Sequence, residues 1–548
     1  MSAATLEGAA PDWRPAALAR IRRVETTALP ANIGALLDQA TASVPDHVAL
    51  HFIATGATLT YAALKDRVDR MAAALRALGV GRGAKVAVML PNVPEMPVTW
   101  LALARLGAVM VPVNVRYTGH ELRYLLDDSA ARHLVLHEDY LGVLDAVPAP
   151  CPRLDAVIVA GTPRAGQHGW RALSDAAVAL AATDPAPGLD DLMNIQYTSG
   201  TTGLPKGCLL TQRYWLTCAL AYADGDGLTY RRILSPNPFF YMTPQWLMLM
   251  AFFHRATLYV APHVSLTHFA DWLRDHRIDY CWFPTDIVAR TPPDPRERDN
   301  CVVRANIAIH RKELHGEVER RFGFRARTAF GMTEIGCGLF TPIEAAEMVG
   351  SGACGMAGPF REARIADMEG RTLPTGQAGE LLIRGPGILR GYHNKPEATA
   401  AAFHGDWVRT GDLATMDARG FVTIVGRIKE MVRRSGENIS ATEVEQALLN
   451  LAGVAEAAVV PVPDALRGEE VKAVIVLEPG LTRADLPPER VIGHCTERLA
   501  TFKVPRFLAY RDAPLPRSTS GKPQKPALIA EAADPRAGCW DRQEARWL

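Results

Sequence analysis

The spacing of apolar residues predicts an amphipathic helix early in the chain. Apolar side chains recur at alternating steps of four and three, at Leu64, Val68, Met71, Leu75 and Leu78. This spacing places them on one face of a helix. Gly79 follows directly and is typical of a helix end. The pattern therefore predicts a helix that packs its apolar face against a domain and ends near Gly79.

Short apolar runs that alternate with helical stretches predict mainly parallel sheet in the first two-thirds of the chain. The runs lie at Val86 to Leu90, Val109 to Val113, His133 to Leu136 and Ala156 to Val159. Another run, Leu247 to Ala261, contains His254 and Arg255 and is too short to cross a bilayer, so it is predicted to be buried core. The expected fold class is α/β, with sheets flanked by helices and no membrane span.

The pattern changes after Gly426. A charged stretch, Arg427 to Arg434, precedes a predicted helix at Thr442 to Leu451 and predicted strands at Ala455 to Val462 and Val471 to Leu477. This is the pattern of a small α+β domain. Because 548 residues are too many for one core, we expect an N-terminal domain over residues 1–426 and a C-terminal domain over 427–548.

Charge and cysteine content narrow the function classes. The 60 Lys and Arg residues balance 59 Asp and Glu residues, so no overall field would attract nucleic acid. The nine cysteines are scattered, without CxxC pairs, and the first thirty residues lack a signal-peptide pattern. We therefore expect a cytoplasmic protein. The sequence shows no heptads or interface stripe, and a monomer or homodimer is expected.

One loop has the composition of a polyphosphate-binding site. Residues 197–207 read YTSGTTGLPKG and follow the apolar run Leu192 to Ile195. Glycines allow close backbone approach, hydroxyl and N–H groups donate to phosphate oxygens, and Lys206 adds a positive charge. The sequence does not match the Walker pattern, because Lys206 follows a proline and precedes Gly207 and Cys208. A flexible polar turn is the alternative interpretation of such a loop taken alone.

Five further segments follow in a fixed order: FGMTE at 330–334, RTGDL at 409–413, GRIKE at 426–430, SGENI at 435–439 and SGK at 520–522. With the loop at 197–207, they resemble the motifs of the adenylate-forming superfamily, which comprises acyl-CoA ligases, adenylation domains and luciferases. The segments RGEEVKA at 467–473 and FKVPR at 502–506 are similar to the crotonobetaine/carnitine-CoA ligase type. The resemblance covers about residues 35 to 530.

The resemblance implies an ATP-dependent acid–thiol ligase. It would form acyl-AMP and pyrophosphate from a carboxylic acid and ATP, and then transfer the acyl group to coenzyme A with release of AMP. Lys522 would contact the carboxylate and the α-phosphate, and Glu334 would hold Mg²⁺ with the hydroxyl of Thr198 or Thr333 nearby. Asp412 would accept from the ribose hydroxyls, Arg427 would contact ribose or phosphate, and Phe330 would face adenine. The remaining ATP-binding residues implied are Ser199, Gly200, Thr201, Thr202, Gly203, Lys206, Gly331 and Met332.

The resemblance also implies that the small domain rotates between the two half-reactions. Lys429 would be the hinge, and Ser435, Gly436 and Glu437 would line the coenzyme A tunnel. Four basic residues could provide charge for the coenzyme A phosphates or form a solvated basic face: Arg433, Arg434, Lys503 and Arg506.

The chain departs from many relatives beside the expected acyl pocket. In PFFYMTPQ, at 238–245, Tyr241 stands where those relatives carry a histidine, with Met242 beside it. HRKEL, at 310–314, replaces a glycine-rich segment. We therefore assign Tyr241, Met242, His310, Arg311 and Gly331 to the acyl pocket. The cations His310, Arg311 and Lys312 suggest a polar or anionic acid, and the alternative is that they face solvent.

Three other functions stay open. The acyl group could be loaded onto the phosphopantetheine of a carrier protein. The chain could be a non-catalytic nucleotide-binding homologue, although it keeps Lys522, Glu334, Asp412 and Arg427. A luciferase-like oxidase shares the motifs, but no feature of the sequence favours it. The sequence does not identify the acid, since one methylene changes specificity by only about 1–3 kcal/mol.

Overall fold

The computed structural model describes residues 12–150, 153–180, 185–198, 205–308, 312–434, 437–517 and 523–548, without the side chains of Glu437 and Asn438. The chain divides into two compact units. Unit 1 comprises residues 1–363 and 383–408, and unit 2 comprises residues 364–382 and 409–548. The predicted boundary near Arg427 lies inside unit 2 and stays a prediction about domain motion.

The first sheet of unit 1 is seven-stranded, in the order β7-β6-β5-β3-β4-β8-β9. Its strands are β3 (Lys85–Met89), β4 (Val109–Pro112), β5 (His133–His137), β6 (Ala156–Ala160), β7 (His168–Gly169), β8 (Leu192–Thr198) and β9 (Lys206–Thr211). All neighbours pair parallel except β8 and β9, which are antiparallel. These strands and the α/β fold class confirm the sequence prediction.

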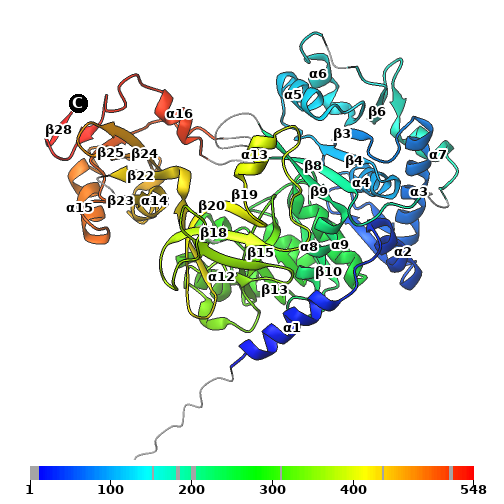
Figure 1. Ribbon diagram of the computed structural model, residues 1–548, viewed down its shortest axis with the longest axis horizontal. Helices are drawn as coiled ribbons and strands as arrows, with labels where there is room; N and C mark the ends of the chain where they lie inside the picture. The colour runs from blue at the N-terminus through cyan, green and yellow to red at the C-terminus, as the bar shows by residue number, and fades with distance from the viewer. Residues whose placement is uncertain are drawn as a thin grey trace, which may run out of the picture. The chain divides into compact units, whose positions relative to one another are not determined.

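Helices lie on both sides of this sheet (Figure 1). They include α2 (Ile33–Ser43), α3 (Tyr61–Ala77), α4 (Glu95–Leu106), α5 (Gly119–Ser129), α6 (Leu141–Asp145) and α7 (Trp170–Ala176). The predicted early helix is α3, whose apolar residues Leu64, Val68, Met71 and Leu75 are buried. Helix α5 begins at a capping box in which Thr118 and Glu121 bond each other's backbone N–H groups, so its start is well defined.

The second sheet of unit 1 is nine-stranded, in the order β16-β15-β14-β13-β12-β10-β11-β1-β2. Its strands are β1 (Val48–Phe52), β2 (Thr58–Thr60), β10 (Arg232–Ser235), β11 (Thr257–Val260), β12 (Tyr280–Trp282), β13 (Arg304–Ile307), β14 (Arg325–Met332), β15 (Gly336–Phe340) and β16 (Met356–Ala357). The strands from β14 to β1 pair parallel. Their carboxyl ends share one edge, where ligands of such sheets bind.

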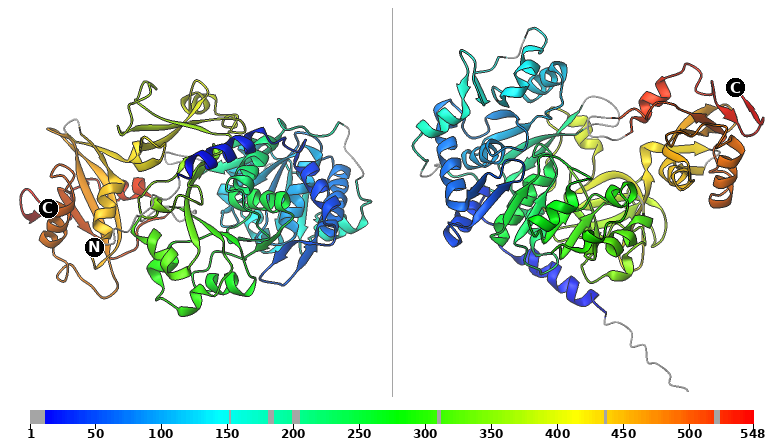
Figure 2. Two further views of the ribbon diagram at one scale, coloured as in Figure 1. Left: turned by 90° about the horizontal axis from the view of Figure 1, so that it is seen from below. Right: turned by 180° about the vertical axis from the view of Figure 1, so that it is seen from behind.

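Further helices of unit 1 are α8 (Gln212–Asp224), α9 (Met242–His254), α10 (Phe269–Asp275), α11 (Asp286–Arg290), α12 (Glu313–Phe322) and α13 (Pro396–Ala401). The run predicted as buried core forms most of α9 together with β11. Most of its residues are buried, whereas Phe253, His254 and Arg255 at its centre are half-buried. The first helix, α1 (Arg14–Thr26), lies against the green part of unit 1 in Figure 2. Arg20 fixes it there by pairing with Glu344 at 2.9 Å and donating to the Gly225 carbonyl.

A five-stranded sheet has the order β17-β18-β20-β19, with β21 paired to β20. Its strands are β17 (Glu362–Ala366), β18 (Gly379–Arg384), β19 (Phe403–His404), β20 (Trp407–Met416) and β21 (Val422–Arg427). Strands β17, β18 and β20 each run from one unit into the other. In unit 2, β20 and β21 are antiparallel and place Asp412 opposite Arg427.

The remainder of unit 2 is a small α+β structure, as predicted. Its sheet contains β22 (Met431–Arg434), β23 (Glu437–Ser440), β24 (Val454–Asp464), β25 (Gly468–Leu477), β26 (Phe507–Tyr510), β27 (Trp540–Asp541) and β28 (Arg546–Trp547). Its helices are α14 (Ala441–Leu449), α15 (Pro488–Arg498) and α16 (Lys525–Ala530). Among the described helices of both units, none is long and apolar enough to cross a membrane.

Candidate active site

The base of the predicted phosphate loop is formed by two antiparallel strands. Thr198 ends β8 and Lys206 begins β9, and the two residues are paired in register. The Thr198 hydroxyl donates to the Lys206 carbonyl at 3.4 Å. The strands approach closely because position 207 is glycine: a Cβ there would lie 2.5 Å from the Ile195 side chain. A larger residue would therefore push the two strands apart.

Helix α5 holds both strands at this base. The Tyr197 hydroxyl donates to Asp128 at 2.6 Å, and the Tyr124 hydroxyl donates to the Pro205 carbonyl at 2.8 Å. Burial and the Asp128 carboxylate raise the pKa of Tyr197, which keeps its hydroxyl protonated as a donor. Residues before and after the loop are thus fixed to one helix.

Glu334 lies at the tip of a tight β-hairpin. Strands β14 and β15 pair Met332 with Gly336, which leaves Thr333, Glu334 and Ile335 in the turn. Gly331 permits this turn, since a Cβ at that position would lie 2.4 Å from the Gly336 carbonyl oxygen. Phe330 and Met332, on either side of Gly331, are half-buried. The hairpin therefore presents the predicted FGMTE residues beyond the parallel part of β14.

Tyr392 joins Glu334 to Lys206. Its hydroxyl donates to the Glu334 Oε1 atom at 2.8 Å, and the Lys206 ammonium lies 4.6 Å from the centre of its ring. Burial and the Glu334 charge raise the pKa of Tyr392, so the phenol stays protonated. Among the described residues, no cation forms an ion pair with Glu334. Its negative charge is therefore available for a ligand.

Asp412 and Arg427 form an ion pair in unit 2. The Arg427 Nε atom lies 2.8 Å from the Asp412 Oδ1 atom, and Arg427 also donates to the Thr410 carbonyl at 3.0 Å. The Asp412 carboxylate is buried, whereas the Arg427 side chain is 40% exposed. A carboxylate held in this way can accept hydrogen bonds from neutral hydroxyls while its charge is balanced locally.

A network of buried amides fixes the segment that contains Tyr241. Asn194 on β8 donates to the Gln245 Oε1 atom at 3.0 Å, and Gln245 donates to the Phe239 and Tyr241 carbonyls at 2.9 and 3.2 Å. Gln196 donates to the Phe240 carbonyl at 2.7 Å. Three consecutive carbonyls are thus bonded to side chains that lie in the core. The Tyr241 segment is therefore tied to the strand that leads into the phosphate loop.

The exposed part of this segment faces polar groups. Burial raises the pKa of Tyr241, and two effects oppose that shift: the charge of Arg116 and a hydrogen bond with Asn114. Met242 is half-buried and its sulfur lies 3.8 Å from the Tyr214 hydroxyl. The Arg116 cation and the Asn114 amide therefore lie near the Tyr241 hydroxyl.

Several predicted residues lie outside the described part of the chain. They are Ser199, Gly200, Thr201, Thr202, Gly203, His310, Arg311, Ser435, Gly436 and Lys522, together with the side chain of Glu437. Lys312 is described and exposed, just before α12. Lys429 is exposed on the turn between β21 and β22. The roles predicted for all of these residues stay predictions.

Most of the basic residues considered for coenzyme A have acidic partners. Lys503 pairs with Glu443 at 2.7 Å, and Arg434 pairs with Glu470 at 2.7 Å. Arg506 lies 3.1 Å from both Asp464 and Asp541. These cations already stabilise unit 2 internally, which leaves less charge for an outside phosphate.

Sequence reasoning did not identify Tyr392, Asp128 or Gln245. Tyr392 lies in a polar segment without a recognisable spacing, and Asp128 is one of two consecutive aspartates on the amphipathic helix α5, so no local signal marked either residue. Gln245 could have been noticed as an amide that begins the apolar run of α9, because a polar residue in such a run is usually buried and bonded.

Comparison with known proteins gives matches along most of the chain. Residues 37–393 match the AMP-binding enzyme family, and residues 443–522 match the AMP-binding enzyme C-terminal domain. A 3-[(3aS,4S,7aS)-7a-methyl-1,5-dioxo-octahydro-1H-inden-4-yl]propanoyl:CoA ligase of Mycobacterium tuberculosis is 33% identical over 516 residues, which cover 90% of this chain and 98% of that protein.

A second relative and a solved structure also match over most of the chain. The crotonobetaine/carnitine-CoA ligase of Salmonella paratyphi C is 31% identical over 490 residues, covering 84% of this chain and 91% of that protein. The solved structure of ATP-bound MatB from Rhodopseudomonas palustris has a TM-score of 0.80 and 29% identity, and the match covers 91% of this chain and 98% of that one.

Proposed function

The chain belongs to the AMP-binding enzyme family, in the acyl-CoA ligase branch of the adenylate-forming superfamily, and we propose how its residues divide the two half-reactions. It is an ATP-dependent acid–thiol ligase that forms an acyl-adenylate and transfers the acyl group to coenzyme A. The link from Lys206 through Tyr392 to Glu334 is the observation that carries our assignment of residues. It joins a cation at the phosphate loop to a carboxylate without a cationic partner among the described residues.

In adenylation, the loop based on Thr198 and Lys206 holds the β- and γ-phosphates of ATP. Two anions must meet in this step, because the acid carboxylate attacks the α-phosphate, so cations at the α-phosphate lower the barrier. Lys522 supplies that charge in our proposal. Phe330 offers its ring to adenine, with Gly331 and Met332 beside it.

Glu334 holds Mg²⁺ in this proposal, with the hydroxyl of Thr198 or Thr333 nearby. Among the described residues, no cluster of three or more acidic, His or Cys side chains could hold a metal ion by itself. A single carboxylate suits Mg²⁺, which usually keeps several waters and completes its shell with substrate phosphates. The ion would screen the phosphate oxygens, and Tyr392 orients the carboxylate that binds it.

Asp412 accepts hydrogen bonds from the ribose hydroxyls. Its partner Arg427 balances its charge, and the exposed part of that guanidinium is free to contact ribose or phosphate. The antiparallel pairing of β20 and β21 fixes both side chains at one register position.

The thioester half-reaction uses the other face of the C-terminal domain. We propose that residues 427–548 rotate about Lys429 relative to residues 1–426, and that Ser435, Gly436 and Glu437 then line the path of the coenzyme A thiol. The exposure of Lys429 on a short turn supports its assignment as the hinge.

The acid is polar or anionic in our proposal. Arg116 and Asn114 near the Tyr241 hydroxyl support this assignment, together with the cations His310, Arg311 and Lys312 in the sequence. If Arg311→Ala leaves the apparent affinity for every acid unchanged, this part of the proposal is wrong.

One assay tests the function and the acid class together. The protein is incubated with ATP, Mg²⁺, coenzyme A and a library of short, aromatic, branched, zwitterionic and dicarboxylic acids, and new thioesters are identified by mass spectrometry. We expect an acyl-CoA that disappears in the Lys522→Ala variant. An AMP-linked product without acyl-CoA would favour loading of a carrier protein, and no product from any acid would contradict the ligase.

A further inference from the structure

Lys525 is a buried lysine between two carboxylates in unit 2. Its ammonium lies 2.5 Å from the Glu430 Oε2 atom and 2.8 Å from the Glu445 Oε1 atom, and its side chain is 15% exposed. Burial alone would lower the pKa of Lys525, but the two carboxylates raise it above its ordinary value. The lysine is therefore charged at neutral pH and bonds both acids at once.

The two carboxylates belong to separate elements. Glu430 ends the turn that carries Lys429, and Glu445 lies on α14. Glu445 also accepts from the Val459 N–H group on β24 at 2.7 Å, so its position is set independently of Lys525. Lys525 is the first residue of α16, and its two ion pairs therefore connect this helix to the turn after β21 and to α14 in unit 2.

Lys525 follows directly on a pair of fixed chain segments. Arg517 and Pro523 form an antiparallel bridge, and the Gln524 N–H group donates to the Pro516 carbonyl at 2.7 Å. Arg517 also forms an ion pair with Glu456 on β24. Residues 517 and 523 therefore lie side by side. Ion pairs hold the chain on both sides of this bridge, at Arg517 and at Lys525.

We propose that Lys525 is a positioning residue for the adenylation half-reaction. It fixes Arg517 and Pro523, the described residues on either side of Lys522 in the sequence, to the turn of Lys429. A movement of that turn would therefore carry both of these residues with it. The inference rests on the proposed role of Lys522 in adenylation. Lys525 itself touches no substrate in this proposal.

The first test separates the half-reactions in the Lys525→Met variant of the full chain. Adenylation is measured as ATP–pyrophosphate exchange with the acid identified from the library, and thioester formation as acyl-CoA made from supplied acyl-adenylate. We expect exchange to fall by about 10- to 100-fold, since a misplacement of roughly 1 Å has such an effect, while the thioester rate stays within about twofold. Lys525→Arg should restore most of the exchange, because it keeps the charge between Glu430 and Glu445.

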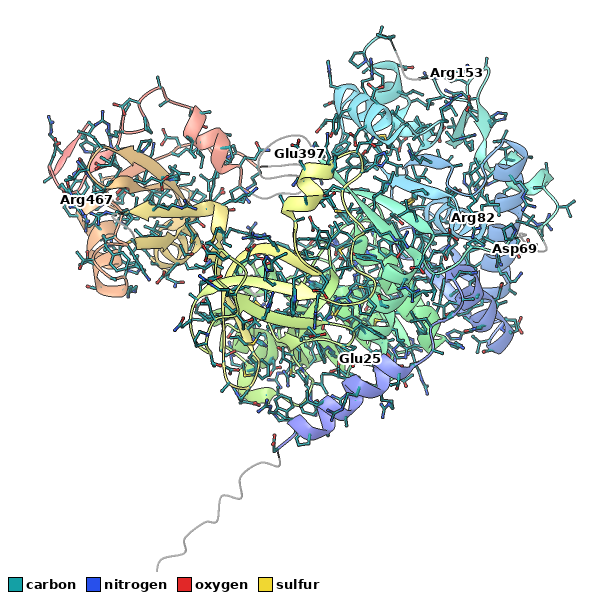
Figure 3. The ribbon with its side chains drawn as sticks, in the orientation of Figure 1. Glu25, Asp69, Arg82, Arg153, Glu397 and Arg467 are labelled. Atoms are coloured by element: carbon teal, nitrogen blue, oxygen red, sulfur yellow. The ribbon has the colours of Figure 1, made fainter. Side chains whose placement is uncertain are left out.

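A matched variant controls for the loss of a bridging lysine. Lys65 on α3 also lies between two carboxylates, at 2.5 Å from Asp69 and 3.7 Å from Asp38, and Figure 3 labels Asp69. Lys65→Met should leave the ratio of the two half-reaction rates unchanged. An equal loss of both rates in Lys525→Met, or no loss of exchange, would overturn the proposal. A wild-type protein without exchange on any acid would instead contradict the proposed function.

The second test needs no acid. Between residues 512 and 535, Arg517 is the one basic residue that proline does not follow, so trypsin can cleave this stretch only after Arg517. If Lys525 fixes this point of the chain, cleavage there should be at least about tenfold faster in Lys525→Met, because about 1.4 kcal/mol of lost local stability gives that factor. Unchanged cleavage, with a melting temperature equal to that of wild type, would show that Lys525 fixes nothing.

Discussion

Two carboxylates predicted to contact ATP or its metal ion, one in each unit, are held in different ways. In unit 1, Glu334 accepts a hydrogen bond from the neutral Tyr392 hydroxyl, and no described cation pairs with it. In unit 2, Asp412 forms an ion pair with Arg427 at 2.8 Å. Both carboxylates are buried, so water does not compensate for the difference.

The difference indicates which ligand each carboxylate can bind. A carboxylate with only neutral hydrogen-bond donors favours a cation as its ligand, because no neighbouring positive charge balances its own. A carboxylate already paired with guanidinium gains little from a second cation, but its remaining lone pairs still accept from hydroxyl groups. The local partners therefore support Mg²⁺ at Glu334 and ribose at Asp412.

The largest effect is expected from Glu334→Gln. The amide keeps the shape of the side chain and still accepts from Tyr392, but it loses the charge that we propose binds Mg²⁺. Acid-dependent ATP–pyrophosphate exchange should fall at least about 100-fold, equivalent to a loss of about 2.7 kcal/mol of transition-state stabilisation. The Mg²⁺ concentration that gives half the maximal rate should rise at the same time.

A surface glutamate of unit 1 provides the control. Glu344 forms an ion pair with Arg20 at 2.9 Å and has no role in the proposed site. Glu344→Gln should therefore leave both the exchange rate and its Mg²⁺ dependence unchanged. If Glu334→Gln lost activity at an unaltered Mg²⁺ requirement, Glu334 would not hold the ion. The contrast between the two carboxylates would then have another cause.

A smaller effect is expected from Asp412→Asn. Hydrogen bonds to a charged acceptor contribute about 1.5–3 kcal/mol, so weakening them should raise the KM for ATP by about tenfold. The Mg²⁺ dependence should not change, because this carboxylate is paired with Arg427 and we propose Glu334 as the ligand of the metal. Measuring KM for ATP at several Mg²⁺ concentrations checks both statements. A shift in Mg²⁺ dependence as large as that of Glu334→Gln would remove the distinction.

The contrast also shows what could be predicted from the sequence. The parallel strands, helix α3 and the small α+β structure were predicted from the spacing of apolar residues. Such a prediction is possible because each type of element, helix or strand, buries its side chains with its own characteristic period. The candidates Glu334 and Asp412 were predicted from their motifs. Their partners differ in this respect: Arg427 lies in a motif, but Tyr392 lies 58 residues after Glu334 in a polar segment.

Contacts between residues that are far apart in the sequence leave no recognisable pattern in the sequence around either residue. Asp128 bonds Tyr197 across 69 residues, and Gln245 bonds Asn194 across 51. Neither position in the sequence specifies its partner, because the pairing depends on which strands and helices become neighbours. Lys525 was not predicted for the same reason, since Glu430 is 95 residues before it.

The smallest effect is expected at the amide network, which has no charged member. Gln245→Met keeps the volume of the side chain but leaves the Phe239 and Tyr241 carbonyls without their donor, at a cost of about 1–3 kcal/mol in the free energy of unfolding. We expect the Tyr241 segment to relax, so the ratio of kcat/KM for two acids of different shape should change by about fivefold, within the range that pocket contacts provide. The KM for ATP should stay constant.

A second buried glutamine separates specificity from stability. Gln212 on α8 accepts from the Ile33 N–H group at 2.8 Å and donates to the Ala104 carbonyl at 3.1 Å, away from Tyr241. Gln212→Met should lower the melting temperature as much as Gln245→Met does, because it also leaves buried backbone groups unpaired. Only Gln245→Met should change the ratio of acids. Equal changes in both variants would mean that the network stabilises the fold without shaping the acyl pocket.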